Sequence, residues 1–209
     1  METIGNEEYE AEARFKRIVE FSKIPAITHM TMRLFNFLPL KGTEEAYLAA
    51  LKFISNREHP FLTLAGKAGR GKTHLALGIG WHWLEVKNEL VMYSQVGSLL
   101  DELRGCYEAR EGDDASYFST KLNQYQKCSL LILDDLGVEQ STEWAREKLD
   151  EIIDYRYINK LPLVVTTNLS PEKLEPRIAG RLREGVCVYL ECGNYRDIIA
   201  RQRKEQKVD

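Results

Sequence analysis

One glycine-rich segment constrains the fold more than any other part of this sequence. The segment Gly66–Thr73 reads Gly-Lys-Ala-Gly-Arg-Gly-Lys-Thr, which fits the pattern G-x-x-x-x-G-K-[ST]. An apolar run, Phe61–Ala65, precedes the segment, and a helical pattern follows over Lys72–Val86. This order predicts a strand, a tight loop and a helix N-terminus, where small residues let backbone N–H groups surround an anion.

The residue types in this loop suit a nucleotide's phosphates. Lys72 supplies a point charge for the β- and γ-phosphates, and the hydroxyl of Thr73 completes a Mg²⁺ shell. Arg70 also lies in the loop, but its side chain receives no role. A glycine turn without chemical meaning is the alternative, which the complete motif in this context disfavours. We therefore predict ATP and Mg²⁺ as ligands. The predicted nucleotide-binding loop comprises Gly66, Lys67, Ala68, Gly69, Arg70, Gly71, Lys72 and Thr73.

Five short apolar runs alternate with helical patterns along the chain. The runs are Phe61–Ala65, Leu90–Tyr93, Leu130–Leu133, Leu163–Thr167 and Val186–Leu190. The helical patterns cover Glu7–Phe21, about Thr43–Asn56 with Thr43 as its cap, Lys72–Val86, Val96–Ala109, Trp144–Asn159 and a last helix from about Tyr195. Alternation of this kind predicts an α/β fold with a five-stranded parallel sheet and helices on both faces.

Polar side chains follow the third and fourth runs. Asp134 and Asp135 come directly after Leu130–Leu133, so we expect Asp134 to hold Mg²⁺ and Asp135 to orient or deprotonate an attacking water. The fourth run should lie between the first and third in the sheet, which would bring Asn168 to the γ-phosphate. A simple turn is the alternative at both positions, and Asn168 could merely cap the turn before Ser170-Pro171.

Arginines gather in the last part of the chain. Pro176 and Gly185 suit the start and exit of a short helix, on which Arg177 and Arg181 share a face. Arg196 opens the last helix. Such arginines are usually solvated, but their position after Asn168 raises the alternative that one of them reaches the ATP of a neighbouring subunit.

Composition excludes some classes of protein. The net charge of −3 argues against a broad nucleic-acid surface, yet a narrow basic track stays possible. The track would consist of Arg104, Arg110, Lys121 and Lys127, interleaved with Tyr107, Tyr117 and Tyr125. The other interpretation is that these tyrosines belong to the core and the charges to solvated faces.

The sequence offers no membrane span and no secretory signal. No window holds 18 consecutive apolar residues, and the first residues are acidic and polar, so we expect a cytoplasmic protein. The cysteines, whose spacing fits no zinc site, are expected to be buried reduced thiols: Cys106, Cys128, Cys187 and Cys192.

Together these motifs resemble the DnaC/DnaI/IstB group, which contains AAA+ helicase loaders and transposition helper ATPases. The similarity runs from about His29 to Ile199, with the motifs in order. They are Gly66–Ala76, Leu130–Gly137, Thr166–Leu169 and Arg177–Leu182 followed by Tyr195-Arg196.

The resemblance implies a AAA+ P-loop ATPase and a role for each matching residue. Lys72 and Thr73 carry over as Walker A, Asp134 and Asp135 as Walker B, and Asn168 as sensor 1. His74 extends the nucleotide-binding motif, Arg196 matches sensor 2 acting in cis, and Arg181 matches an arginine finger acting in trans, with Arg177 another arginine of that segment. The resemblance also implies an ATP-driven homo-oligomer that binds single-stranded DNA along the helices of about Tyr93–Lys127.

The resemblance leaves the partner open. Helicase loaders of this group carry a separate N-terminal domain, whereas here we expect only a helical segment and linker in residues 1–28, ahead of a AAA+ domain in 29–209. We therefore expect a helicase-loader-like ATPase acting with a replicative helicase, or alternatively an IstB-like helper acting with a transposase on duplex DNA. A small-molecule kinase is disfavoured, because Val138–Asn159 predicts a short loop and one helix rather than an arginine-rich lid.

Overall fold

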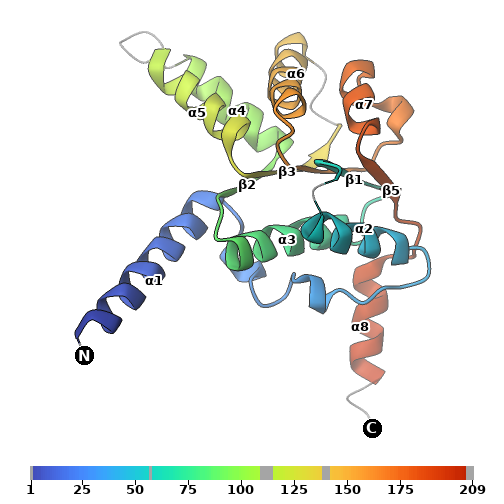
Figure 1. The fold of residues 1–209 in the computed structure, drawn as a ribbon. Helices are drawn as coiled ribbons and strands as arrows, with labels where there is room; N and C mark the ends of the chain where they lie inside the picture. The colour runs from blue at the N-terminus through green and yellow to red at the C-terminus, as the bar shows by residue number, and fades with distance from the viewer. Residues whose placement is uncertain (1, 57, 109–114, 138–141, 206–209) are drawn as a thin grey trace.

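A five-stranded, all-parallel sheet forms the centre of the molecule, with helices on both faces (Figure 1). The computed structural model describes the chain except for residues 1, 57, 109–114, 138–141 and 206–209. The strands are β1 (Phe61–Ala65), β2 (Val91–Gln95), β3 (Leu130–Leu136), β4 (Leu163–Thr167) and β5 (Val186–Tyr189). The predicted fold class is confirmed.

The helices divide between the two faces of the sheet. α2 (Glu44–Ser55) and α3 (Lys72–His82) cover one face, together with the end of α1 (Glu2–Ser22). The other face carries α4 (Val96–Glu108), α5 (Ala115–Lys127), α6 (Glu143–Ile158) and α7 (Pro176–Arg183). In Figure 1, α1 and α8 (Tyr195–Glu205) extend away from the sheet on the side of α3. Among the described residues, no helix is long and apolar enough to span a bilayer.

Strand order brings the predicted chemistry to one edge. The order is β2-β3-β4-β1-β5, so β4 lies between β1 and β3 as predicted. β1 and β4 are buried along their whole length, which explains their continuous apolar runs. Because all five strands are parallel, their carboxyl ends share one edge, where the loops after β1, β3 and β4 meet.

A β-bulge interrupts β3 at its carboxyl end. Leu133 pairs with Val165 and Leu136 with Thr167, so Asp134 and Asp135 together oppose the single residue Thr166. Asp135 takes the left-handed conformation with φ of 62°, which is uncommon for a residue with a side chain. Asp134 is buried, whereas Asp135, which has the left-handed conformation, is exposed.

Several element boundaries differ from the predictions. The predicted helix Lys72–Val86 is α-helical only to His82 and then widens into a π-helical turn, Trp83–Lys87. That turn buries Trp83, whose indole N–H donates to the Glu89 carboxylate over 3.0 Å. Thr43 precedes α2, but its hydroxyl bonds to the backbone of Leu40 rather than capping the helix.

Short-range features at other helix ends agree with the sequence. Pro176 begins α7 as predicted, and the Glu175 carboxylate accepts hydrogen bonds from the backbone N–H groups of Arg177 and Ile178.

All four cysteines are free thiols, but Cys187 is exposed, so the expectation that it is buried is wrong. Cys187 lies on β5, an edge strand.

Candidate nucleotide-binding site

The loop after β1 joins the strand to the N-terminus of α3, as the motif predicts. Gly71 precedes α3 with φ of 97°, and a Cβ at this position would lie 2.9 Å from Cε2 of Phe37. Gly66 has φ of 141°, and its Cβ would meet the carbonyl oxygen of Leu190 at 2.6 Å. These two positions therefore require glycine for both backbone conformation and close packing.

The side chain of Lys72, the first residue of α3, folds back into the glycine-rich loop. Its side-chain amine donates to the carbonyl oxygens of Gly66 and Lys67, over 2.8 and 3.0 Å. The same amine donates to the Asn168 side-chain oxygen over 2.7 Å. Burial lowers the pKa of Lys72, while the charges of Asp135 and Asp134 oppose the shift. The cation is therefore placed where an incoming phosphate could replace the carbonyl and amide oxygens as its partner.

Asn168 lies between the basic residue Lys72 and the acidic residue Asp135 and contacts both. The side-chain oxygen of Asn168 accepts from Lys72, and its amide nitrogen donates to Oδ1 of Asp135 over 2.5 Å. A single side chain at the end of β4 thus bridges the cation of the loop and the outer carboxylate of β3. Asn168 therefore contacts both the loop after β1 and the end of β3.

Asp134 is buried and surrounded by hydroxyl groups. Its Oδ1 accepts from Thr166 over 2.6 Å and from Thr73 over 3.0 Å, and its Oδ2 accepts from Tyr93 over 2.8 Å. Burial, together with the charge of Asp134, raises the pKa of Tyr93, so the phenol keeps its proton and donates. The sequence analysis did not assign Tyr93 to the site. A hydroxyl-bearing residue near the carboxyl end of the strand beside β3 could have indicated that it contacts Asp134.

The paired oxygens of Thr73 and Asp134 fit a Mg²⁺ ion. Mg²⁺ takes oxygen ligands and is usually held by one or two carboxylates plus substrate phosphates. Among the described residues, no cluster of three or more His, Cys, Asp or Glu side chains could hold a metal by itself. The donor set therefore suits a metal that arrives with a nucleotide.

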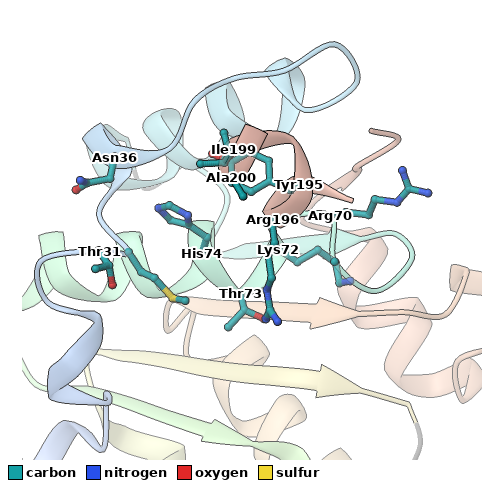
Figure 2. Close-up of a pocket in the computed structure, with 13 residues that line it drawn as sticks. Thr31, Asn36, Arg70, Lys72, Thr73, His74, Tyr195, Arg196, Ile199 and Ala200 are labelled. Carbon is teal, nitrogen blue, oxygen red and sulfur yellow. The ribbon is translucent and has the colours of Figure 1, made fainter. Parts of the chain in front are cut away.

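A pocket of about 280 Å³ lies beside the loop (Figure 2). Its lining combines three parts of the chain: the loop and start of α3, residues 31–36, and α8. Figure 2 shows Arg196 at the start of α8, over Lys72 and Thr73. The full lining is Thr31, Met32, Asn36, Gly69, Arg70, Gly71, Lys72, Thr73, His74, Tyr195, Arg196, Ile199 and Ala200.

Tyr195, the first residue of α8, contacts both Phe37 and the loop. The Tyr195 ring stacks on Phe37 at 4.7 Å, and the Tyr195 backbone N–H donates to the Gly69 carbonyl over 2.7 Å. His74 packs edge-on against Phe37, and its Nε2 lies 3.0 Å from the carbonyl oxygen of Arg33. His74 therefore connects α3 to residues 33–37 as well as lining the pocket.

Arg181 lies away from its own chain's pocket. Its Nε donates to Oδ1 of Asp154 over 2.9 Å, and its guanidinium lies 4.3 Å from the centre of the Tyr157 ring. Arg181 also lines a cavity with Phe61, the first residue of β1, which is the strand end opposite the phosphate loop. Arg177, one turn earlier, donates to the other oxygen of Asp154 over 2.6 Å.

The residues of the predicted basic track differ in exposure and in their contacts. Tyr107 and Tyr117 are about half exposed, and Arg104 lies 5.2 Å above the Trp144 ring. Tyr125, however, is fully buried, so for this residue the core interpretation holds. Lys121 pairs with Glu102 over 3.1 Å.

One further member, Lys127, lies away from the exposed tyrosines. Lys127 lies at the other end of α5, in a cavity with Pro60 and Pro162. Arg110 lies outside the described residues.

The fold and the site define a AAA+ P-loop nucleotide-binding protein. The family model of the IstB-like ATP binding protein matches residues 3–178. The chain belongs to this IstB-like ATP-binding family, and the predicted likeness to the DnaC/DnaI/IstB group is confirmed.

Individual relatives come from phage-like elements and replication. The chain is 26% identical over 205 residues to the phage-like element PBSX protein XkdC of Bacillus subtilis (strain 168), covering 90% of this chain and 72% of XkdC. It is 30% identical over 115 residues to the replicative helicase loader DnaI of the same organism, covering 54% of this chain and 35% of DnaI. The crystal structure of the DnaC helicase loader matches with a TM-score of 0.67 and 27% identity, covering 79% of this chain and all (100%) of that chain.

Proposed function

We propose that this chain is an ATP hydrolase with a helicase-loader-like role, which binds MgATP, assembles into a homo-oligomer and engages single-stranded DNA and a replicative helicase. The bridge made by Asn168 between Lys72 and Asp135 is the observation that carries the proposal. It couples the group expected to hold the γ-phosphate to the group expected to act on water. Such a link suits hydrolysis, because ATP binding without hydrolysis would not need Asp135.

Each residue of the site has a role in this proposal. Lys72 and the backbone N–H groups of the loop bind the phosphates, and Asp135 accepts a proton from the attacking water or orients it. Thr73 and Asp134 hold Mg²⁺, which neutralises phosphate charge. Arg196 contacts the nucleotide of its own subunit, while Arg181 reaches that of a neighbour.

Similarity to DnaI and DnaC supports the choice of a loader. The family to which the chain belongs equally supports the alternative, an IstB-like helper that acts with a transposase on duplex DNA. Tyr107 and Tyr117 are exposed, Arg104 lies one turn before Tyr107 on α4, and Lys121 lies over the Tyr117 ring. This arrangement favours single-stranded DNA, because bases stack on aromatic rings while cations follow the backbone.

Fluorescence anisotropy with labelled single-stranded and duplex oligonucleotides tests the proposal, in the presence of ATP or ADP. We expect tighter binding of the single strand with ATP, weakened by salt because phosphate contacts release counterions. Co-elution with the host's replicative helicase, stronger with ATP than with ADP, should accompany it. Duplex preference together with no helicase co-elution would contradict the loader role and favour the transposase helper.

A further inference from the structure

We propose that Tyr93 and Thr166 are positioning residues that hold the carboxylate of Asp134 in the orientation in which it takes the Mg²⁺ of MgATP. The inference rests on the proposed function, because it assumes that Asp134 serves the metal. It adds two hydroxyl groups, one from each strand beside β3, to the residues that determine how tightly the metal binds.

The sheet register places these hydroxyls around Asp134. Tyr93 in β2 and Val164 in β4 are both register partners of Ile132. Because side chains alternate between faces, Ile132 and Asp134 share a face with Tyr93 and Thr166, the face that α3 covers. The register partner of Asp134 is Gln95, two residues after Tyr93, and the length of the tyrosine side chain carries its hydroxyl to the Asp134 carboxylate.

The hydrogen bonds leave Asp134 little freedom to rotate. Thr166 donates to Oδ1 over 2.6 Å, Tyr93 donates to Oδ2 over 2.8 Å, and the side chain of Asp134 is buried. Thr73, the third donor, is the residue expected to ligate the metal and so belongs to the site itself. Tyr93 and Thr166 are thus the donors that fix each oxygen from outside the metal shell.

Thr166 also holds the bulge. Its oxygen accepts from the backbone N–H of Asp135 over 2.9 Å while its hydroxyl hydrogen goes to Asp134. One side chain thereby orients Asp134 and stabilises the left-handed backbone of Asp135, which is otherwise unfavourable. Hydrogen bonds behind metal ligands commonly fix ligand orientation, and their loss costs about 10–100-fold in metal affinity or activity.

The test measures metal dependence of nucleotide binding rather than turnover. A fluorescent ATP analogue is titrated at increasing MgCl₂ and, separately, in EDTA. For Tyr93→Phe we expect the Mg²⁺ midpoint to rise by about 10–100-fold, while affinity in EDTA is unchanged, because only the metal-dependent part of binding uses the hydroxyl. Thr166→Val should shift the midpoint likewise, and Thr166→Ser, which keeps the hydroxyl, should restore it.

Tyr125→Phe is the matched control. Tyr125 is also buried, and its hydroxyl donates to Glu102 rather than to Asp134. The Mg²⁺ midpoint of this variant should equal that of the wild type. An unchanged midpoint in Tyr93→Phe, or an equal loss of affinity in EDTA, would overturn the inference; should Tyr93→Phe not fold, the Thr166 pair decides by the same criterion.

Asp134→Asn separates this inference from the proposed function. If Asp134→Asn keeps the wild-type Mg²⁺ midpoint, Asp134 does not serve the metal, and both the site assignment and this inference are wrong. If Asp134→Asn loses Mg²⁺ dependence while Tyr93→Phe and Thr166→Val keep it, only the inference is overturned.

Discussion

At the scale of single residues, the two carboxylates of β3 differ because of one extra residue in the strand. Asp134 is buried against three hydroxyl groups, whereas the bulge redirects Asp135, which is exposed and contacts Asn168. Without the bulge, strict alternation would place the two side chains on opposite faces of the sheet. The bulge therefore lets adjacent acids serve one site in different roles.

Asp135→Asn should keep ATP binding and slow hydrolysis. The amide preserves the shape of the side chain but loses the charge that orients or deprotonates water, while Asp134 stays intact. General-base assistance is worth roughly 10²–10⁴-fold, so single-turnover hydrolysis should fall by a factor in that range. Hydrolysis at the wild-type rate would show that Asp135 has another role.

The sequence could predict those parts of the site that are contiguous in the chain, and not those that depend on contacts between distant residues. The loop Gly66–Thr73 and the acids after β3 are contiguous motifs, so their spacing alone predicts a strand, a loop and ligands. Tyr93, Thr166 and Phe37 act through contacts between distant parts of the chain, which a single sequence does not display. The bulge was missed for the same reason, since register is a property of a strand pair.

At the scale of elements, the two central strands β1 and β4 were predicted with their exact bounds. The runs Phe61–Ala65 and Leu163–Thr167 match β1 and β4, because buried parallel strands leave continuous apolar segments. The helix from Lys72 was predicted to continue unchanged to Val86, yet packing of Trp83 widens its end into a π-helical turn. Such tertiary contacts override helical periodicity.

A charged cluster attaches the end of α1 to α4 and α5. Lys23 donates to Oε2 of Glu102 over 2.5 Å, Tyr125 donates to the same oxygen, and Lys121 pairs with Oε1 over 3.1 Å. Burial raises the pKa of Glu102, but the hydrogen bonds from Lys23, Tyr125 and Lys121 outweigh it and lower the pKa to about 2. The proposed division into residues 1–28 and 29–209 depends on how firmly this cluster joins the two parts.

Glu102→Gln should lower the free energy of unfolding by about 1.5–3 kcal/mol at neutral pH, the range for hydrogen bonds to charged groups. Because the pKa is depressed from 4.5 to about 2, the contribution of Glu102 is complete above 4.5 and is lost as the pH falls toward 2. The difference between wild type and variant, measured by urea unfolding, should therefore shrink in that window. Asp101→Asn, whose side chain is 80% exposed, is the control and should change little; a pH-independent difference for Glu102→Gln would contradict the assignment.

At the scale of the whole molecule, Arg196 and Arg181 lie in different places relative to the nucleotide pocket. Arg196 lines the pocket of its own chain, whereas Arg181 lies on α7 beside Asp154 and Tyr157. One chain therefore presents a nucleotide site lacking this arginine and, elsewhere, an arginine that its own site does not use. We propose that a neighbouring subunit joins the two.

Arg181→Ala should bind ATP almost normally but lose hydrolysis and ATP-dependent assembly. An arginine inserted beside a γ-phosphate is worth about 10³–10⁵ in rate, or roughly 4–7 kcal/mol of transition-state stabilisation. Mixing Arg181→Ala with Asp135→Asn should restore part of the hydrolysis, because one kind of interface then combines an intact arginine with an intact Asp135.

Arg177→Ala is the matched control for this mixing experiment. Arg177 contacts the other oxygen of the same Asp154, so its loss disturbs the same cluster without removing Arg181. We expect Arg177→Ala to retain more hydrolysis than Arg181→Ala. Failure of every mixing ratio to restore hydrolysis, combined with weak ATP binding by Arg181→Ala alone, would make Arg181 a ligand in its own subunit.

The central claim is that the loop Gly66–Thr73 binds ATP through Lys72, and titration of a fluorescent ATP analogue tests it most directly. Lys72→Ala removes the cation that lies inside the loop against Gly66, Lys67 and Asn168, so binding should be abolished or severely weakened. Lys52→Ala, which removes an exposed lysine on α2, should bind as the wild type does. Wild-type affinity and wild-type hydrolysis in Lys72→Ala would contradict the account.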